Sequence, residues 1–373
     1  MKFKIKKHIL LEALNNVAHA LSSKNIIPIL SGIKFDLNRD KLILTASDND
    51  ITIQTEILKD DDMEISKTGS IVIKGKYILD IIRKLDSEWI NLEIVDDHKI
   101  MIYTENSEFN LNGIDPFEYP AVDFTLSDNC ISIPVNNFKD IINQTTYAAS
   151  LDEARTVLTG VNIKINNNVL ECSSTDSYRL ALKSFKLDDK VKVPDTDIII
   201  PSRNLNELLK MMDVSEEENI DIHIFSNKII FKFNNILFQS RLINGSYPNT
   251  KNLIPKESLF NLRVNKREFY NMVDRASILN NDRDNNIITM EIKDNYLNIT
   301  SMSLEVGKVF EKMKVVCDDK IKISFSSRYM LDALRTIKSE DIILTFVGEI
   351  KPILLSESDD DSLICLILPI RTY

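Results

Sequence analysis

The 373-residue sequence contains few of the residues that mark several common classes of protein. Its 4 cysteines lie far apart and form no C-x-x-C pair, so we expect reduced thiols rather than disulfides or a zinc site at Cys130, Cys172, Cys317 and Cys365. With 8 glycines and no Pro/Gly/Ser-rich segment, the chain should have short, ordered joints between its domains. No apolar run approaches the ~18 residues of a membrane span, and the basic N-terminus has no signal-peptide core, so we expect a cytoplasmic protein.

Catalytic signatures are also missing. The segment 69–77 resembles a phosphate-binding loop, but it has one residue too many between its glycines and Tyr77 where Ser or Thr would hold magnesium. Asp48 and Asp50 could form a metal pair, yet the sequence 47–48 recurs as 175–176, which favours a structural turn. The histidines have no partner at metal or triad spacing: His8, His19, His98 and His223. We therefore expect no catalytic site, no metal and no cofactor.

The main positive signal is an internal repeat. Residues 71–82 (IVIKGKYILDII) return as residues 323–334 (ISFSSRYMLDAL), and weaker copies begin at residues 3, 131, 198 and 262. Each copy starts with a short alternating apolar run and continues into an amphipathic stretch, which predicts a strand followed by a helix. In the second copy one helical stripe should face a core, and it consists of Ile78, Ile81, Ile82 and Leu85.

The six repeats group into three domains. A polar turn between two strand patterns follows each predicted helix, which predicts six hairpins with turns at 38–40, 96–97, 166–168, 226–227, 294–295 and 348–349. The distance from repeat start to turn alternates between long and short, so neighbouring units pair. We expect an α+β protein with antiparallel sheets, two strand-helix-strands units per domain, and domains at 1–127, 128–254 and 255–373.

Charge is distributed unevenly between the predicted helices and the remaining chain. The chain has a formal net charge of -10, whereas the six helices together carry +8, which leaves -18 for the rest. If all six helices faced one way, an acidic protein would present one basic surface suited to a polyanion. Lys and Arg are also good helix formers, so this bias alone does not identify a nucleic-acid partner.

Five ordered motifs are similar to those of the bacterial DNA polymerase III beta subunit family, the replicative sliding clamps. They are 26–30 (IIPIL), Arg155 with 158–160 (LTG), 174–181 (STDSYRLA), 245–248 (GSYP) and 368–371 (LPIR). The resemblance covers the whole chain. It implies three clamp-like domains, helices on the inner face of a head-to-tail dimeric ring and antiparallel sheets outside.

The resemblance also implies a role without catalysis of its own. A ring holds double-stranded DNA by topology, so sequence-independent phosphate contacts are enough, and the protein would be associated with the nucleoid. The third helix, where Lys139 is opposed by Asp140, should contribute little. The basic residues expected to face DNA are Lys24, Lys76, Arg83, Lys84, Arg203, Lys210, Arg275, Arg328, Arg335 and Lys338.

A second implied site is an apolar cleft that captures linear peptides from the replicative polymerase, an ATP-dependent clamp loader, repair polymerases and mismatch-repair proteins. Ser177 and Tyr178 stand where other members have Gly and His, so the cleft rim should differ here. The implied cleft residues are Arg155, Leu158, Thr175, Ser177, Tyr178, Arg179, Leu180, Pro248, Leu253, Ile350, Pro352, Leu368, Pro369, Ile370 and Arg371. The implied dimer contacts are Phe109 and Leu111 with Ile278 and Leu279, which could otherwise be ordinary core residues.

Two other interpretations remain open from the sequence. A repeated-domain scaffold with no DNA role would explain the symmetry of the chain. A carboxylate-based hydrolase would use some of the 56 Asp and Glu residues, but nothing in the sequence brings two of those carboxyl groups together.

Overall fold

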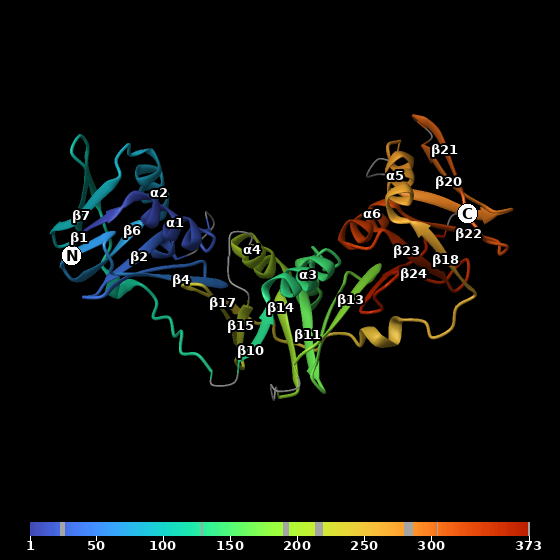
Figure 1. The fold of residues 1–373 in the computed structure, drawn as a ribbon, viewed down its shortest axis with the longest axis horizontal. Helices are drawn as coiled ribbons and strands as arrows, with labels where there is room; N and C mark the ends of the chain where they lie inside the picture. Colours follow the sequence, from blue (N-terminus) through green and yellow to red (C-terminus); the bar gives the residue numbers. More distant parts are fainter. Residues whose placement is uncertain are drawn as a thin grey trace. The chain divides into compact units, whose positions relative to one another are not determined.

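The computed structural model of the chain describes residues 1–22, 27–127, 130–188, 194–212, 219–279, 286–303 and 305–371. The chain forms two compact units, Met1–Asn136 with Asn206–Leu242 and Asn137–Leu205 with Ile243–Tyr373 (Figure 1). Helices α3 (Val135–Thr146) and α4 (Ser202–Met212) each cross from one unit to the other along the chain. None of the helices in the described ranges is long and apolar enough to span a bilayer.

The first unit contains two antiparallel sheets. Their strand orders are β10-β15-β16-β17-β4-β3-β2-β6 and β5-β1-β7-β8-β9. Helices α1 (Lys7–Ala18) and α2 (Gly75–Lys84) lie side by side, and α1 packs against β3 and β4. The strands are β1 (Lys2–Lys6), β2 (Gly32–Leu37), β3 (Lys41–Ser47), β4 (Ile51–Leu58), β5 (Met63–Lys67), β6 (Gly69–Lys74), β7 (Trp89–Asp96), β8 (Lys99–Tyr103), β9 (Glu108–Asn112), β10 (Ile131–Pro134), β15 (Asn219–Ile224), β16 (Lys228–Phe233) and β17 (Ile236–Arg241), with short 3-10 helices η1 (Pro28–Ser31) and η2 (Pro116–Glu118).

The second unit also has two antiparallel sheets, ordered β14-β11-β12-β13-β25-β24-β23-β18 and β21-β20-β19-β22. Helices α5 (Lys266–Ser277) and α6 (Ser327–Thr336) lie side by side, and α5 packs on β20 and β21. The strands are β11 (Gly160–Asn166), β12 (Val169–Thr175), β13 (Arg179–Lys186), β14 (Thr196–Pro201), β18 (Phe260–Asn265), β19 (Ile287–Lys293), β20 (Tyr296–Ser303), β21 (Gly307–Lys314), β22 (Ile321–Ser326), β23 (Asp341–Phe346), β24 (Ile353–Glu357) and β25 (Leu363–Ile367), with short 3-10 helices η3 (Glu153–Thr159) and η4 (Thr250–Leu253).

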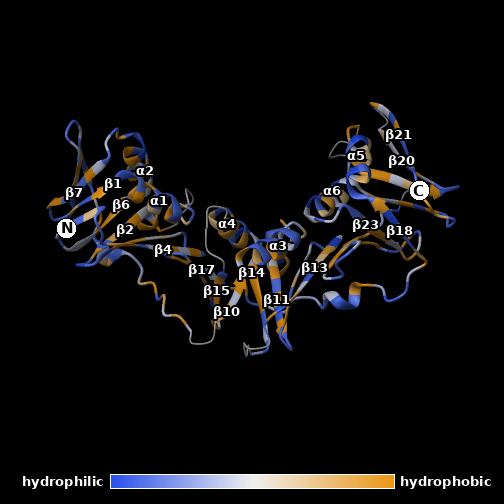
Figure 2. Ribbon diagram, viewed as in Figure 1, coloured by the Kyte–Doolittle hydropathy of each residue, from blue (hydrophilic) through white to orange (hydrophobic). Residues whose placement is uncertain are grey.

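The predicted repeat is confirmed as six strand-helix pairs. The strand leads directly into the helix in β1–α1, β6–α2, β10–α3, β14–α4, β18–α5 and β22–α6. All six predicted turns join paired antiparallel strands, which confirms the six hairpins. Many strands alternate buried positions with half-buried or exposed ones, as in β19 and β23, and Figure 2 shows the apolar residues that produce this alternation. The period of two therefore places one face of each such strand in a core.

Helix α2 shows how the repeat buries its apolar stripe. Ile78 and Ile82 are fully buried and Leu85 is nearly so, whereas Ile81 is half-buried at the edge of the stripe. Gly75 opens the helix where a Cβ atom would lie 2.3 Å from Cδ1 of Leu21. The absence of a side chain at Gly75 therefore leaves room for the Leu21 side chain beside the helix.

Two strand ladders build the large sheets. Strand β4 pairs with β17, and strand β13 pairs with β25, both antiparallel. Each eight-stranded sheet therefore takes four strands from each of two predicted domains. The two compact units consequently divide the chain differently from the domain boundaries expected near residues 127 and 254, which stay a prediction.

All four cysteines are free thiols, and three of them are buried, namely Cys172, Cys317 and Cys365. Burial raises the pKa of Cys365 to about 11. This thiol is therefore protonated at neutral pH, as expected of a core residue rather than a reactive one.

Candidate functional site: a groove beside the C-terminal tail

A tight turn at the start of β13 forms the centre of the site. Oδ1 of Asp176 accepts hydrogen bonds from the backbone N–H groups of Tyr178 at 2.9 Å and Arg179 at 3.0 Å. Ser177, at the corner, has a φ of 80°, a conformation that favours glycine. Its hydroxyl accepts a hydrogen bond from Nη1 of Arg155 at 3.1 Å, which holds the rim of the turn. The turn exposes the ring of Tyr178.

The same turn occurs in the first unit. Oδ1 of Asp48 accepts from the backbone N–H groups of Asp50 at 3.0 Å and Ile51 at 2.8 Å, and Asn49 has a φ of 82°. The structural-turn role predicted for Asp48 is thereby confirmed. Here Asp50 occupies the position of Tyr178, so the repeated backbone carries different side chains.

Tyr247, from the GSYP motif, fixes the strand before the turn in the second unit. Its phenolic oxygen accepts a hydrogen bond from the backbone N–H of Thr175 at 3.0 Å, and its hydroxyl lies 3.4 Å from the carbonyl of Gly160, to which it donates. Burial raises the pKa of Tyr247 to about 12, so it remains a neutral donor. Tyr247 therefore fixes the backbone on which the turn depends. The next residue of the motif, Pro248, is exposed.

Arg179 forms a buried charge network under the turn. Its Nε donates to Oδ2 of Asp176 at 3.0 Å, and its Nη1 donates to Oδ2 of Asp332 on α6 at 2.7 Å. The guanidinium carbon lies 4.6 Å from the ring centre of Tyr329 and 5.5 Å from that of Tyr147. Two carboxylates and two aromatic rings thus satisfy a cation that is only 8% exposed. This network ties the turn to α6.

The residues after β25 run across the top of this network. The backbone N–H of Leu368 donates to the carbonyl of Tyr178 at 2.9 Å, and that of Ile370 donates to the carbonyl of Ser324 at 2.7 Å. Backbone bonds therefore hold the tail between the turn and β22. Leu368 remains 37% exposed, which leaves apolar surface available.

A cavity of about 840 Å³ lies against this tail. Apolar, aromatic and polar groups share its wall, as is typical of ligand sites. The carbonyl of Asn286 accepts from the backbone N–H of Ser327 at 2.8 Å, which fixes one wall at the start of α6. The lining residues are Tyr178, Asn286, Ser326, Arg328, Tyr329, Leu368, Pro369 and Ile370.

The structure brings only part of the predicted cleft to this cavity. Tyr178, Leu368, Pro369 and Ile370 line it. Thr175, Arg179 and Leu180 are buried, and Arg155 and Ser177 form the rim bond. The remaining predicted residues do not line the cavity: Leu158, Pro248, Leu253, Ile350, Pro352 and Arg371, of which Leu253 and Ile350 are 49% and 64% exposed. The assignment of all fifteen residues to one cleft stays a prediction.

Sequence reasoning missed three residues of the wall and gave a fourth another role. Asn286, Ser326 and Tyr329 were not proposed, and Arg328 was assigned to DNA. Tyr329 occupies the repeat position of Tyr77, which is exposed on α2, so the repeat itself contained a signal for an outward aromatic ring.

The basic residues predicted to contact DNA are exposed wherever the structure describes them. Lys24 lies outside the described residues, as does Ile26 of the first motif. Several of the cations already have partners. Arg275 donates to both carboxylate oxygens of Glu311 at 3.0 and 2.7 Å, and Nζ of Lys338 lies 2.5 Å from Oδ1 of Asp140.

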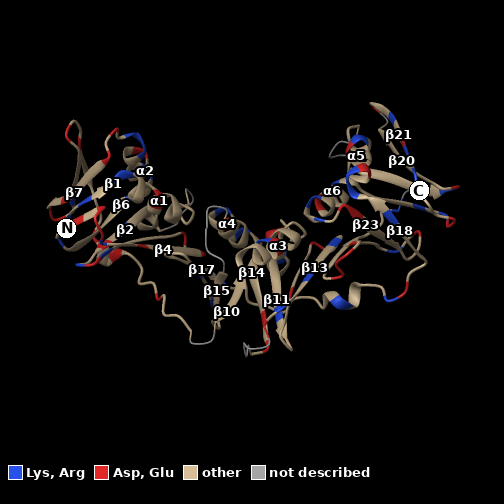
Figure 3. Ribbon diagram, in the orientation of Figure 1, with Lys and Arg blue, Asp and Glu red and all other residues tan. Residues whose placement is uncertain are grey.

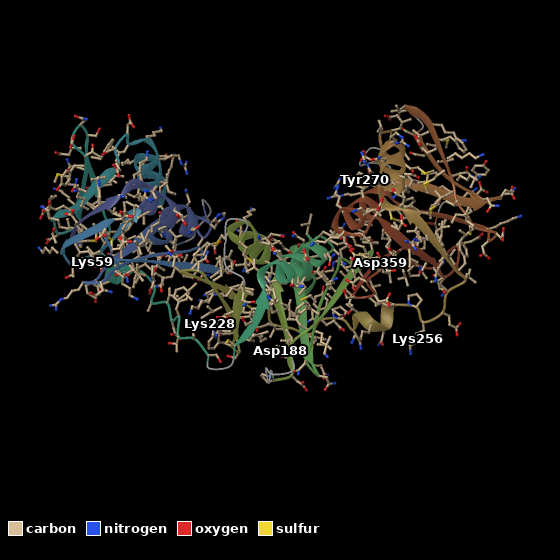
Figure 4. All side chains as sticks on the ribbon, viewed as in Figure 1. Lys59, Asp188, Lys228, Lys256, Tyr270 and Asp359 are labelled. Atoms are coloured by element: carbon tan, nitrogen blue, oxygen red, sulfur yellow. The ribbon has the colours of Figure 1, made fainter. Side chains whose placement is uncertain are left out.

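Other predicted cations have weaker or local partners. Lys210 pairs with Glu207 at 2.8 Å one turn away, and Arg335 pairs with Asp332 at 3.3 Å. Nε of Arg335 also donates to the hydroxyl of Tyr270 at 3.1 Å; Figure 4 labels this tyrosine on α5. Figure 3 shows acidic and basic residues together on α5 and α6. The helices therefore present mixed charge rather than a purely basic surface, and the DNA assignment stays a prediction.

The predicted dimer residues lie outside the core, on edge strand β9 and directly after helix α5. Phe109 on edge strand β9 is 38% exposed, and Ile278, directly after α5, is 72% exposed. Leu111 and Leu279 are half-buried, and Leu279 lies near Gly307 at the start of β21. Strand β21 is itself an edge strand and exposes Phe310, which sequence reasoning missed. Their role in an interface stays a prediction.

These features define a repeated α+β protein with a groove beside its C-terminal tail. Family models described as the N-terminal, central and C-terminal domains of the DNA polymerase III beta subunit match residues 1–123, 132–249 and 251–371. The chain belongs to this DNA polymerase III beta subunit family, the bacterial sliding clamps.

Individual relatives match the entire chain. It is 41% identical over 379 residues to the beta sliding clamp of Staphylococcus epidermidis and 40% identical to that of Staphylococcus aureus, with 100% of both chains covered in each case. The crystal structure of the DNA polymerase sliding clamp from Bacillus subtilis is 38% identical and superimposes with a TM-score of 0.95, again covering 100% of both chains. The predicted family and the α+β fold of three clamp domains are confirmed. The DNA sliding clamp function is supported over the alternative of a scaffold without a DNA role.

Proposed function

We propose that two copies of this chain close head to tail around duplex DNA and tether a replicative polymerase to it. The observation that carries this proposal is the full-length match to sliding clamps across all three domains. A closed ring keeps DNA by topology, so its phosphate contacts need only be weak and independent of sequence. The protein then acts in the cytoplasm at the nucleoid, as an accessory subunit without catalysis of its own.

The exposed cations of α2 suit such weak contacts. Lys76 and Lys84 are exposed and form no ion pair among the residues that the structure describes, while Arg83 donates only to Asn15 at 3.4 Å. We expect these residues to contribute more to DNA retention than Arg275 and Lys338, whose carboxylate partners compete with phosphate. Domain boundaries near residues 127 and 254 would place α2 in the first domain.

The groove beside the tail suits an extended peptide. Leu368, Pro369 and Ile370 offer apolar contact to a Leu or Phe anchor, while hydroxyl and amide groups can fix a peptide backbone. We propose that it binds linear segments of the replicative polymerase, an ATP-dependent clamp loader, repair polymerases and mismatch-repair proteins. Since we expect no nucleotide site in the chain, the energy for ring opening would come from the loader.

Two edge strands suit the ring contact. Strand β9 exposes unpaired backbone groups together with Phe109, and β21 does so with Phe310. Lys308 and Lys312 on β21 complement Glu108 on β9 in charge. We propose that β9 of one copy pairs with β21 of the other and that Ile278 and Leu279 pack beside Phe109 and Leu111.

Retention on DNA of different topology tests the function. The protein is loaded by a clamp loader onto a nicked circle, and half of the sample is then linearised. We expect slow loss from the circle and rapid loss from the linear form, with little dependence of circle retention on salt. Equal loss from both forms would refute encirclement.

A further inference from the structure

Two of the 8 glycines directly follow an asparagine, at residues 112–113 and 244–245. In such a pair the backbone nitrogen of glycine can attack the amide carbon of the asparagine side chain, because glycine has no side chain to block the approach. Both asparagines are exposed to solvent. The two pairs therefore share their chemistry and differ in how the structure holds the attacking nitrogen.

A strand ladder holds the first pair. Asn112 ends β9, and the backbone N–H of Gly113 donates to the carbonyl of His98 at 2.6 Å. A Cβ atom at Gly113 would lie 2.4 Å from Cδ1 of Ile71, so the backbone has little room to turn. The nitrogen of Gly113 must therefore break a hydrogen bond and leave its packing before it can react.

The second pair lies in an exposed loop between two anchors. Before the loop, the backbone N–H of Ile243 donates to the carbonyl of Ile199 at 2.9 Å, and after it the buried ring of Tyr247 is held by its hydroxyl group. Residues 244–246 are exposed. Within the described part of the chain, neither the asparagine side chain nor the glycine nitrogen of this loop forms a hydrogen bond. Both reacting groups are therefore free to approach each other.

We propose that Asn244 is a site of spontaneous deamidation in the folded protein. The nitrogen of Gly245 loses its proton and attacks Cγ of Asn244, ammonia leaves, and a cyclic succinimide forms. Water then adds to either carbonyl of the ring and opens it, which gives aspartate or isoaspartate. A water molecule is consumed, ammonia is released, and the residue becomes an anion at neutral pH. This reaction does not depend on the proposed clamp function.

The modification alters the segment that leads to Tyr247. Isoaspartate routes the backbone through the former side chain, which lengthens the main chain by one atom between the anchors. Gly245 has a φ of 140°, and a Cβ atom there would lie 2.7 Å from Cγ2 of Val157, so its surroundings are already close. The added length should therefore disturb the hydrogen bond from the backbone of Thr175 to Tyr247. We expect the aged protein to unfold at a lower temperature.

Peptide mapping of the aged full-length protein tests the proposal. The protein is kept for days in mildly alkaline buffer and then digested. Mass spectrometry measures deamidation, and labelling by an isoaspartate methyltransferase measures the isoaspartate product. We expect Asn244 to convert about tenfold faster than Asn112, because a backbone hydrogen bond must open first at Asn112. In urea the two asparagines should convert at similar rates, since the fold produces the difference.

The variant Asn244→Gln should block the reaction at this position, because glutamine would have to form a larger ring. Asn112→Gln is the matched control and should leave the conversion of Asn244 unchanged. After ageing, the midpoint of thermal unfolding should fall in the unchanged protein and in the control, but not in Asn244→Gln. Circular dichroism of the fresh variants verifies that they fold.

Three results would overturn the proposal or its consequence. Equal conversion of the two asparagines in the folded protein would show that the β9 ladder does not protect Asn112. An Asn244 that stays intact in the folded protein and converts only in urea would show that the native loop prevents the reaction. Conversion of Asn244 without a fall in the thermal midpoint would refute the effect on Tyr247.

Discussion

The buried guanidinium of Arg179 and two carboxylates compensate one another's charge. Its pairs with Asp176 and Asp332, at 3.0 and 2.7 Å, lie under the groove. Removing one member of a buried charge network lowers the free energy of unfolding by more than the intact network adds to it, because the remaining buried charges lose their partner. We expect Arg179→Met to lower the free energy of unfolding by about 3 kcal/mol in urea titrations. Arg155→Met, which removes an exposed arginine on the rim, should cost well under half of that, and equal losses would contradict the network's role.

Asp360 makes the stability of the second unit depend on pH. Burial opposes its ionisation, but hydrogen bonds from Ser362 and Lys183 prevail and lower its pKa from 3.8 to about 2. Because the folded pKa is depressed, its stabilisation is present above pH 4 and is lost as pH falls towards 2. Since the side chain of Asp360 is 44% exposed, we expect its ionised form to add about 1 kcal/mol to the free energy of unfolding at neutral pH.

Urea titration of Asp360→Asn at several pH values checks this contribution. The variant should be less stable than the unchanged protein at pH 7, and the two curves should converge in acid. Its neighbour Asp359 is exposed and forms no ion pair with Lys183 in the described part of the chain, so Asp359→Asn is the control. A difference that persists at pH 2 would exclude the ion pair as its cause.

The C-terminal tail is the element on which the groove depends. It supplies Leu368, Pro369 and Ile370 to the cavity wall, and backbone bonds to Tyr178 and Ser324 hold it there. We expect deletion of residues 368–373 to abolish peptide binding, measured by fluorescence anisotropy. The deletion begins after β25 ends at Ile367, so the sheet and the dimer should remain. Unchanged peptide affinity, or loss of the dimer, would contradict this assignment.

Strands and helices were predictable from sequence because their signals are local. The periods of apolar residues in β6 and α2 reappear in β22 and α6, and the polar turns mark the hairpins. The C-terminal tail and Tyr178 could be assigned to the groove from the sequence, because they lie in motifs shared with sliding clamps.

The rest of the groove depends on contacts between distant segments. Asn286 and Ser326 reach the cavity because β19 pairs with β22 and positions the start of α6. No local pattern encodes that pairing. The charge sum over the helices likewise could not show that Asp140 neutralises Lys338 or that Glu311 neutralises Arg275, because these carboxylates are remote in sequence.

Within each compact unit, one sheet continues from one predicted domain into the next. The β4–β17 ladder joins four strands of residues 1–127 to four of residues 128–254, and β13–β25 does the same for the second and third predicted domains. Hydrogen-bonded ladders resist bending more than flexible linkers do. The joints between the predicted domains are longer than the scarcity of glycine led us to expect, because β9 ends at Asn112 while β10 begins at Ile131, and β17 ends at Arg241 while β18 begins at Phe260.

Strands β9 and β21 end their sheets without a partner, so assembly should depend on the apolar residues beside them. Ile278 is 72% exposed, so a charge there should not disturb the monomer but should be costly in a buried contact between copies. We expect Ile278→Asp to raise the dimer dissociation constant by about a hundredfold, measured by sedimentation at low concentration, and to shorten retention on circular DNA. Val316→Asp is the matched control, because Val316 is 97% exposed and lies outside the proposed contact. A dimer that tolerates the charge at Ile278 as well as the control would place the ring contact elsewhere on the surface.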